Sequence, residues 1–455
     1  MKPAPIVDAV TATLIHDGEL YLTHRQRKLS AFPGYQAFPG GKVDRSDSGE
    51  PLPQAVFAGH DARLIRALSR ELDEELGFDL IANAEQIEAV RMMGIALTPP
   101  AAPVRFNTHF FRVDLRSRPD FILCEPEIES GAWASARHWM SVYEQGELLL
   151  APPTQAVVRS LAVDPTSTDA GFADFNDTGV LRPLEALRGV RQFFVRSNTL
   201  PPAIHTNCFL IGDDDHGQRI LVDPSPNSRE ELERIYAAAS SAGFDEVFLT
   251  HHHPDHRQYA DEIARRAGVP LGMSAWTLQH LRSGQARYGE GPDYGAGLRI
   301  KTYADGDSVT RWLGQTVRAL AVPGHDEGQL ALMPDNRAWC IVGDLIQGVG
   351  TVVIAPPEGD MRKYFNSLKQ VIALDPRVIY PSHGLALGGV HYIEQALQHR
   401  QMREDQIKGL FSAGRSIEEM LAEVYRDVDP RLLPLARINI ESHLTKLRED
   451  GAIAA

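Results

Sequence analysis

The sequence predicts a multidomain protein of mixed α/β and α+β architecture. The chain has 455 residues, which is longer than a domain with a single hydrophobic core ordinarily is. Short apolar stretches typical of strands alternate with amphipathic helical stretches over most of its length. The last segment, from about residue 400, is mostly helical in pattern. We therefore expect three domains that follow one another along the chain.

The first predicted domain covers residues 1–165. Its β-rich stretches VTATLIHDGELYLTHR and VRFNTHFFRVDL flank an amphipathic helix near 61–76, and TQAVVRSLAV forms a further helix near its end. Residues 166–187 are predicted to be a linker, because the stretch TSTDAGFADFNDTG is rich in Asp, Thr, Ser and Gly.

The second predicted domain covers residues 188–398 and alternates strands with helices. Its strands are TNCFLIGD, RILVDPS, EVFLT, VRALAVPG, WCIVGDLI and VIYPSHG, with helices near 227–242 and 258–267 among them. The third predicted domain, 399–455, contains the helical stretches SIEEMLAEVY and LPLARINIESHLTKLRED.

Composition indicates a soluble protein of the cytoplasm. Hydrophobic residues make up 43% and charged residues 23%. The sequence has no apolar run long enough to span a bilayer, no signal peptide in MKPAPIVDAV, and three scattered cysteines without a CxxC pair. We therefore expect a reducing compartment and no membrane partner. The net charge of −14 disfavours loose binding to nucleic acid, although it leaves room for a local basic groove.

Residues 249–256 read LTHHHPDH and are the densest group of imidazoles in the chain. The preceding EVFLT is a short apolar strand, so the histidines lie at the C-terminal end of a strand, where open α/β sheets usually keep their sites. Side chains alternate in an extended segment. His251 and His253 can therefore face one metal while His252 faces away.

A turn at Pro254 can direct Asp255 and His256 toward a second position, and imidazole and carboxylate ligands suit a zinc-like ion. Three further residues follow apolar strands in the same way: His325 in VPGHDEGQL, Asp344 in VGDLI and His383 in YPSHG. A lone histidine at such a place is ordinarily a capping or core-edge residue. All of them together, with the HxHxDH pattern, predict a metal centre.

These residues resemble the metallo-β-lactamase fold. Seven positions match it in the family's order: His251, His253, Asp255, His256, His325, Asp344 and His383. By this resemblance, His251, His253 and His325 hold one metal. Asp255, His256 and His383 hold the other, and Asp344 bridges the two. The implied cofactors are two Zn²⁺ ions, or Mn²⁺ or Fe, and the implied nucleophile is a bridging hydroxide that Asp255 orients as a catalytic residue.

The resemblance implies an αβ/βα sandwich and the hydrolase branches that bind two metals, those similar to glyoxalase II and to ribonucleases. One departure is HRQYADE, which stands where many relatives have two glycines. HTNCFLIGD and ILVDPSP resemble the family's opening hairpin, with Asp223 as a structural aspartate near the metal loop.

The end of the chain resembles the C-terminal winged helix of the branch that includes endoribonucleases. ARINIESHLTKLREDGAI is similar to the final helix and short strand of that module. A winged helix often contacts nucleic acid, but residues 400–455 carry nine basic and ten acidic side chains. This balance favours a packing or dimerisation module, and homo-oligomeric assembly stays open.

Residues 70–78 read RELDEELGF, which places Glu71, Glu74 and Glu75 on one face of a helix. The plain interpretation is a solvated acidic face. Clustered carboxylates repel one another unless a cation lies between them, and the glycine-rich AFPGGKVDRSD upstream can deliver this helix to a site.

Together these stretches resemble the Nudix box, matched by Gly41, Arg70, Glu71, Glu74, Glu75 and Gly77. The resemblance implies an α/β/α sandwich in which the three glutamates are catalytic and bind Mg²⁺ or Mn²⁺, braced by Arg70. The spacing from Gly41 to Arg70 is longer than in the compact box, and Ala62 stands where its first glutamate would fall. A longer insert and LLLAPPTQ resemble the coenzyme A-directed branches.

Three functions follow from these patterns. The first is a metal-dependent hydrolase in the second domain that cleaves a phosphodiester, as in single-stranded RNA, or a thioester. The second is a pyrophosphatase in the first domain that acts on nucleoside-diphosphate-linked small molecules such as coenzyme A. The alternative is that the Nudix-like domain is an inactive ligand-binding or scaffold module and that the winged helix recruits a partner or dimerises.

Overall fold

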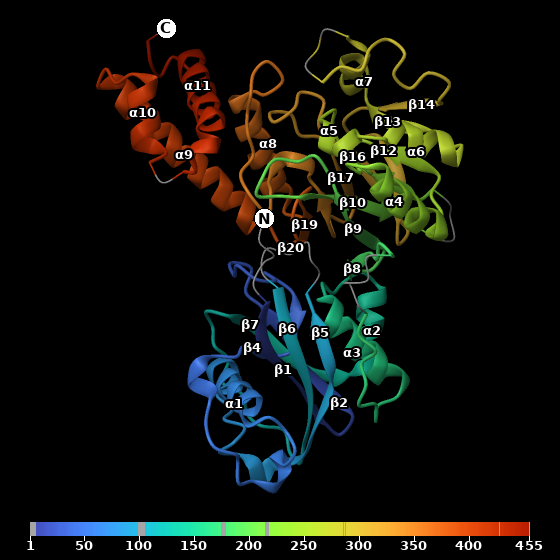
Figure 1. Cartoon of the computed structure of the whole chain (residues 1–455), viewed down its shortest axis with the longest axis vertical. Coiled ribbons are helices and arrows are strands. Elements are labelled where there is room, and N and C mark those ends of the chain that lie inside the picture. The colour runs from blue at the N-terminus through green and yellow to red at the C-terminus, as the bar shows by residue number, and fades with distance from the viewer. Residues whose placement is uncertain are drawn as a thin grey trace. The chain divides into compact units, whose positions relative to one another are not determined.

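A computed structural model of the protein describes residues 6–98, 105–173, 179–213, 218–284, 286, 288–426 and 428–454. Residues 174–178 of the predicted linker lie outside the described residues. The chain divides into two compact units, Met1–Arg191 and Gln192–Ala455 (Figure 1). Mixed α/β structure in more than one unit agrees with the predicted fold class.

A mixed sheet forms the centre of the first unit. Its strands are β1 (Ile6–His16), β2 (Glu19–Arg25), β3 (Gln36–Ala37), β4 (Gly40–Lys42), β5 (Ile87–Leu97), β6 (Arg105–Leu115) and β7 (Ile128–Ser135). The sheet runs in the order β3-β2-β1-β6-β5, while β4 pairs with β1 and β7 with β2. β1 is parallel to β6 and antiparallel to β2.

Helices cover both faces of this sheet (Figure 1). They are α1 (Ala62–Leu76), α2 (Ala136–Glu144) and α3 (Pro152–Val163), and a short strand, β8 (Leu184–Leu187), ends the unit. Alternate residues of β1 point to opposite faces: Val10 and Leu14 pack with α1, whereas Ile15 packs with α2 and α3. The unit is therefore layered as the sequence predicts, while its assignment as a Nudix fold stays a prediction.

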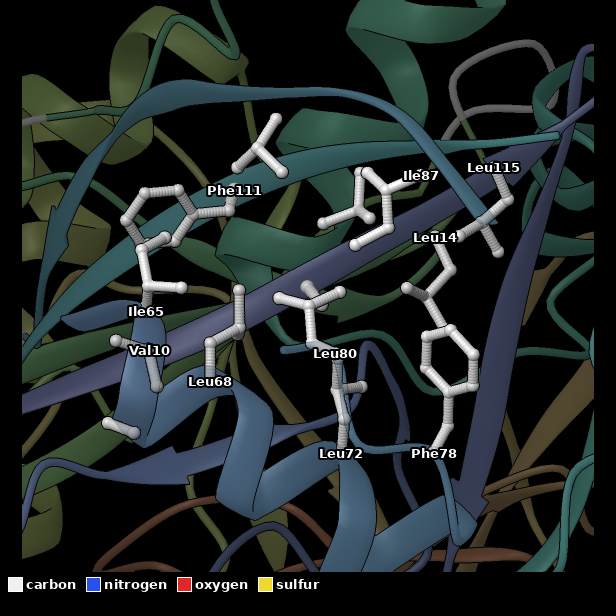
Figure 2. Close-up of a cluster of buried hydrophobic side chains, with 14 of the residues drawn as sticks. Val10, Leu14, Ile65, Leu68, Leu72, Phe78, Leu80, Ile87, Phe111 and Leu115 are labelled. Atoms are coloured by element: carbon white, nitrogen blue, oxygen red, sulfur yellow. The ribbon is translucent and has the colours of Figure 1, made fainter. Parts of the chain in front are cut away.

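Helix α1 forms as the sequence predicts, because its apolar residues recur at helical spacing. Asp61 caps its first turn by accepting a hydrogen bond from the Arg63 N–H at 2.9 Å. Gly77 ends the helix in the left-handed region at φ 65°. Figure 2 shows the buried side of the helix, where Leu68 and Leu72 lie among strand residues such as Phe111.

Two sheets form the centre of the second unit. The first contains β9 (Val190–Arg196), β10 (His205–Ile211), β11 (Ile220–Val222), β12 (Glu246–Phe248), β13 (Leu271–Ser274) and β14 (Ile300–Tyr303), side by side in this order. The second contains β15 (Ser308–Trp312), β16 (Gln315–Ala321), β17 (Leu330–Pro334), β18 (Cys340–Ile341), β19 (Val378–Tyr380) and β20 (Leu387–Gly388), also in this order. Phe209 of β10 packs on Tyr380 of β19, with ring centroids 5.5 Å apart, so the two sheets meet face to face.

Helices lie outside these sheets, with α8 and α6 on opposite sides in Figure 1. The helices are α4 (Arg229–Ala242), α5 (Pro254–Arg257), α6 (Ala260–Ala267), α7 (Ala275–Arg282), α8 (Met361–Leu374), α9 (His391–Ser412), α10 (Ile417–Val424) and α11 (Leu433–Glu449). The strands and helices predicted from the sequence of this unit are present. One detail is wrong: the described residues after α11 form a turn and irregular chain, and no short strand follows it.

Helix α9 runs without a break across the predicted boundary at 398–399. Ile393 near its start packs in the core of the second sheet, whereas Ile407 near its end packs with α10 and α11. One helix thus contributes to two cores. The domain boundaries stay predictions, and residues 399–455 do not form a separate compact unit.

Two simpler expectations concern cysteines and membranes. Cys124, Cys208 and Cys340 are free thiols. Within the described ranges, each helix is too short or too polar to cross a bilayer.

We expect Leu68→Ala to lower the free energy of unfolding of the first unit by about 2–5 kcal/mol, because it leaves a cavity at a fully buried site. Urea denaturation followed by fluorescence measures this loss. Ile122→Ala removes as many carbon atoms from a side chain that is 77% exposed and is the matched control. Equal losses of stability in the two variants would show that Leu68 of α1 does not contribute to the hydrophobic core.

Candidate metal centre

Four loops bring the seven predicted ligands together. Each loop follows a strand of the second unit, namely β12, β16, β18 or β19. The loop after β16 requires glycine at position 324, because a Cβ there would lie 2.2 Å from the Tyr364 backbone nitrogen. This close approach fixes the neighbouring His325.

The first group of donors consists of His251, His253 and His325. The Nδ1 atom of His253 lies 3.1 Å from Nε2 of His251 and 2.9 Å from Nε2 of His325. All three donor atoms are within 4.8 Å of one another. His251 is fully buried, and His325 is 8% exposed. The alternation predicted for this segment is therefore present, since His252 does not join this group.

The second group consists of Asp255, His256 and His383, whose donor atoms also lie within 4.8 Å of one another. Asp344 lies between the groups. Its Oδ1 atom is 3.5 Å from Nε2 of both His256 and His383, and its Oδ2 atom is 3.5 Å from Nε2 of His325. This placement agrees with the bridging role implied for Asp344, which stays a prediction.

Hydrogen bonds to a carbonyl or a carboxylate fix the outward nitrogen of three of these rings. His325 Nδ1 lies 2.8 Å from the Val353 carbonyl, and His383 Nδ1 lies 2.8 Å from the His205 carbonyl. A carbonyl only accepts, so each Nδ1 carries the proton and each Nε2 presents a lone pair to the centre. His256 Nδ1 likewise faces Asp223 Oδ2 at 2.9 Å.

Asp223 organises the loop that begins at Thr250. It accepts the Thr250 N–H at 2.8 Å and the Thr250 hydroxyl at 2.6 Å, in addition to His256. The hydroxyl oxygen in turn lies 3.0 Å from His251 Nδ1, which therefore donates to it. One buried carboxylate thus orients a ring of each group, as its predicted structural role requires. Thr250 was not predicted, since a buried threonine has no distinctive sequence signal.

Burial and neighbouring charges shift the protonation of the centre. Burial lowers the pKa of His251 and of His253 well below the usual range, and the adjacent imidazoles add to this effect. Burial opposes a charge on Asp344 too, but His256 and His383 outweigh it and hold the pKa of this carboxyl well below its usual range. His256 responds in the opposite direction, because the Asp255 and Asp344 carboxylates outweigh its burial and raise its pKa.

The donor set fits a pair of divalent cations. His256 Nε2 and Asp344 Oδ1 are buried without any hydrogen-bond partner among the described residues. Orphaned polar atoms of this kind are costly unless something else binds them. Separations of 3.5 Å are too long for hydrogen bonds but suit ligands that share one ion. Imidazole and carboxylate donors together are typical of zinc, and also suit manganese or iron.

A second group of titratable side chains lies beside the centre. His252 forms a fully buried ion pair with Asp326, and the His280 Nε2 atom is 3.7 Å from Glu358 Oε1. Although three of these donors lie within 4.8 Å of one another, the rings of His252 and His280 lie against each other at 4.1 Å. The two ring planes are tilted by 49°, and His252 already pairs with Asp326. We therefore interpret this group as an ion-pair network that ties His252 to the loop of His325.

The glutamate helix of the first unit is arranged differently. Glu75 is 3% exposed, accepts the Gly40 N–H at 3.0 Å and lies 3.6 Å from Arg25. Glu71 fills the space beside Gly41, where a Cβ would lie 2.3 Å from its carboxylate. Within the described residues, Glu71, Glu74 and Glu75 do not gather into one set of donors.

Arg70 occupies two of these carboxylates. It donates to Glu71 at 2.8 Å and to Glu74 at 3.3 Å, and it grips the Lys42 carbonyl at 2.8 Å. It also binds both oxygens of Asp47 at 3.1 Å. Arg70 thus braces the glycine-rich loop as predicted, whereas Asp47 was missed because a loop aspartate without a helical pattern gives no signal.

Burial also changes the acidity of this helix. It raises the pKa of Glu75 to about 7, although Arg25 opposes the shift. Burial raises the pKa of Glu71 as well, against the pull of Arg70. A carboxyl that titrates near neutral pH is suited to proton transfer.

Comparison with known proteins identifies two domains of the second unit. Residues 201–383 match the family profile described as "Metallo-beta-lactamase superfamily", and residues 416–455 match "Beta-lactamase associated winged helix domain". Neither profile reaches the first unit, so the Nudix assignment gains nothing from them.

Individual relatives agree with these matches. Beta-lactamase-like protein 2 homolog of Drosophila melanogaster is 26% identical over 260 residues, which are 54% of this chain and 84% of the relative. Atrochrysone carboxyl ACP thioesterase of Aspergillus fumigatus is 28% identical over 205 residues, 44% of this chain and 58% of that one. A crystallised beta-lactamase domain protein from Burkholderia ambifaria shares the fold, with a TM-score of 0.50, 22% identity, and coverage of 61% of this chain and 91% of that chain. The chain therefore carries a metallo-β-lactamase domain followed by a β-lactamase-associated winged helix domain, an architecture consistent with a hydrolase.

Proposed function

We propose that the second unit hydrolyses a thioester between an acyl group and a carrier thiol. The observation that carries the proposal is the convergence of two donor groups that share Asp344. We assign His251, His253 and His325 to one cation and Asp255, His256 and His383 to the other. When bound, such a pair of cations polarises the carbonyl and lowers the pKa of water, which supplies a nucleophile near neutral pH.

The side chains of this chain then have separate tasks. The hydrogen bonds on Nδ1 of His256, His325 and His383 hold each ring in one orientation, so that no reorganisation is needed during the reaction. We assign to Asp255, whose side chain is 16% exposed, the tasks of orienting the attacking water and accepting its proton. The water oxygen bonds to the carbonyl carbon, the C–S bond breaks, and the thiol leaves with a proton.

Two facts favour a thioester over a phosphodiester. The Aspergillus relative is named as a thioesterase of an acyl carrier protein. The net charge of −14 and the balanced charges of the C-terminal segment give no general attraction to a polyanion. Single-stranded RNA is therefore the competing substrate class and belongs in the same assay.

We expect Asp344→Asn to reduce both bound metal and hydrolysis by more than about 100-fold, since even changes to residues that support a ligand cost 10–100-fold. Metal analysis and thioester assays of the purified chain measure this. Asp335→Asn, at an exposed ion pair with Arg318, is the control and should behave as the wild type. Retention of a full complement of metal by Asp344→Asn would contradict the shared-ligand assignment.

The substrate class is decided by assays of the full chain with acyl-coenzyme A, acylglutathione and single-stranded RNA, each with Zn²⁺, Mn²⁺ and Mg²⁺. Release of free thiol that depends on Asp344 supports the proposal. Cleavage of RNA without release of thiol would contradict the thioester proposal and support a phosphodiester substrate.

We propose a second activity for the first unit, Mg²⁺- or Mn²⁺-dependent cleavage of a pyrophosphate in a nucleoside-diphosphate-linked small molecule. The supporting observation is the arrangement of Glu71 and Glu75 against the glycine-rich loop, with Glu75 titrating near neutral pH. Hard cations prefer carboxylate oxygens. Binding would have to draw the carboxylates of Glu71 and Glu74 away from Arg70.

Glu75 also predicts a pH dependence of stability. Its folded-state pKa of about 7 exceeds the ordinary value of 4.5, so the folded chain holds this proton more tightly than the unfolded chain does. The resulting stabilisation is full below pH 4.5 and is lost as the pH rises through 7. Its size is on the order of 3 kcal/mol. Urea denaturation between pH 5 and 8 in the absence of metal measures it.

Glu75→Gln should flatten this dependence, and Mg²⁺ should also flatten it in the wild type by holding the carboxylate ionised. Glu88→Gln, at an exposed position of β5, is the control. A pH dependence that Mg²⁺ leaves unchanged would argue against cation binding at Glu75.

A further inference from the structure

We infer that Arg400, Asn439 and Ser442 of the C-terminal helices are positioning residues for the metal ligand His325. They act through residues 352–354, which we call the strap. The inference deepens the proposed function and rests on it, because it concerns how one ligand of that centre is held.

The strap is bound directly to the C-terminal helices. Asn439 of α11 accepts the Ile354 N–H through Oδ1 at 3.2 Å, and Ser442 donates its hydroxyl to the Ile354 carbonyl at 2.6 Å. Arg400 of α9 donates to the Val352 carbonyl. These three side chains are 4–6% exposed, so water does not compete for their hydrogen bonds.

Between these anchored residues lies Val353, whose carbonyl accepts the Nδ1–H of His325 at 2.8 Å. The strap is apolar, and the residues on either side of Val353 are buried, with Val352 3% and Ile354 0% exposed. Displacement of the strap would therefore move or remove the acceptor that fixes the ring of His325. Partners of this kind set the affinity of a ligand for its metal.

Arg400 reaches the centre by a second path. Its guanidinium lies 5.5 Å from the centre of the Tyr364 ring, and the Tyr364 hydroxyl donates to the Leu345 carbonyl at 2.9 Å. Leu345 follows Asp344 directly in the chain. The same arginine thus supports the segments that carry His325 and Asp344.

The test is a titration of the metal-free full chain with Zn²⁺ and with Co²⁺, whose absorption reports the ligand geometry. We expect Ser442→Ala and Asn439→Ala to weaken the binding of the metal ion held by His325 by about 10–100-fold. The affinity for the second metal ion should stay within about twofold of the wild type. Ser412→Ala, which removes an exposed hydroxyl from α9, is the matched control. A merely structural role would lower the unfolding temperature yet leave both affinities of the folded chain unchanged.

A second readout keeps the inference separate from the proposed function. The Nδ1–H resonance of His325 in the metal-free chain should shift or exchange faster in both variants and not in Ser412→Ala. A wild type that binds no cation would end the proposed function, while this resonance would still report the link. Unchanged resonance and unchanged affinities in folded Ser442→Ala and Asn439→Ala would overturn the inference.

Discussion

The second unit depends on one electrostatic constraint. Five imidazoles and two carboxylates are held in a buried space, with their lone pairs directed at one another. Without a cation, His256 Nε2 and Asp344 Oδ1 have no partner among the described residues. The arrangement is costly on its own and favourable with ions between the groups. The remaining features of the centre are ways of enforcing this geometry.

Residues that are not themselves predicted metal ligands hold the ligands in this geometry. Asp223 accepts hydrogen bonds from both Thr250 and His256, and it thereby orients the loop after β12. Backbone carbonyls at His205 and Val353 fix His383 and His325. The His252–Asp326 ion pair joins the loop after β12 to the loop after β16, which belong to different sheets. The centre is rigid because each of these partners belongs to a strand end or to a segment packed in the core.

Much of this was predictable, because periodicity and chemical type are local properties. The apolar spacing predicted α1, the strand pattern predicted β10 and β12, and the alternation within HxHxDH predicted that His251 and His253 lie together; the assignment of each ligand to a metal stays a prediction. The prediction of a short strand after the last helix was wrong: residues 450–454 form a turn and irregular chain and do not pair with another strand. Asp47, Asp326 and Asn439 were not predicted, because a polar residue acquires its role only from a partner far away in sequence. The three glutamates of α1 show the same limit: the helix forms as predicted, but Arg70 occupies Glu71 and Glu74, while Glu75 is bound to the Gly40 N–H.

The continuity of α9 has a mechanical consequence. Ile393 and Ile407 belong to different cores but lie on one unbroken helix. The metallo-β-lactamase domain and the C-terminal helices are therefore connected by a continuous helix and not by a flexible linker. A displacement of the C-terminal end of α9 is transmitted to its N-terminal end. The two modules are therefore expected to unfold as a single piece, and cutting the chain at residue 398 would destabilise both.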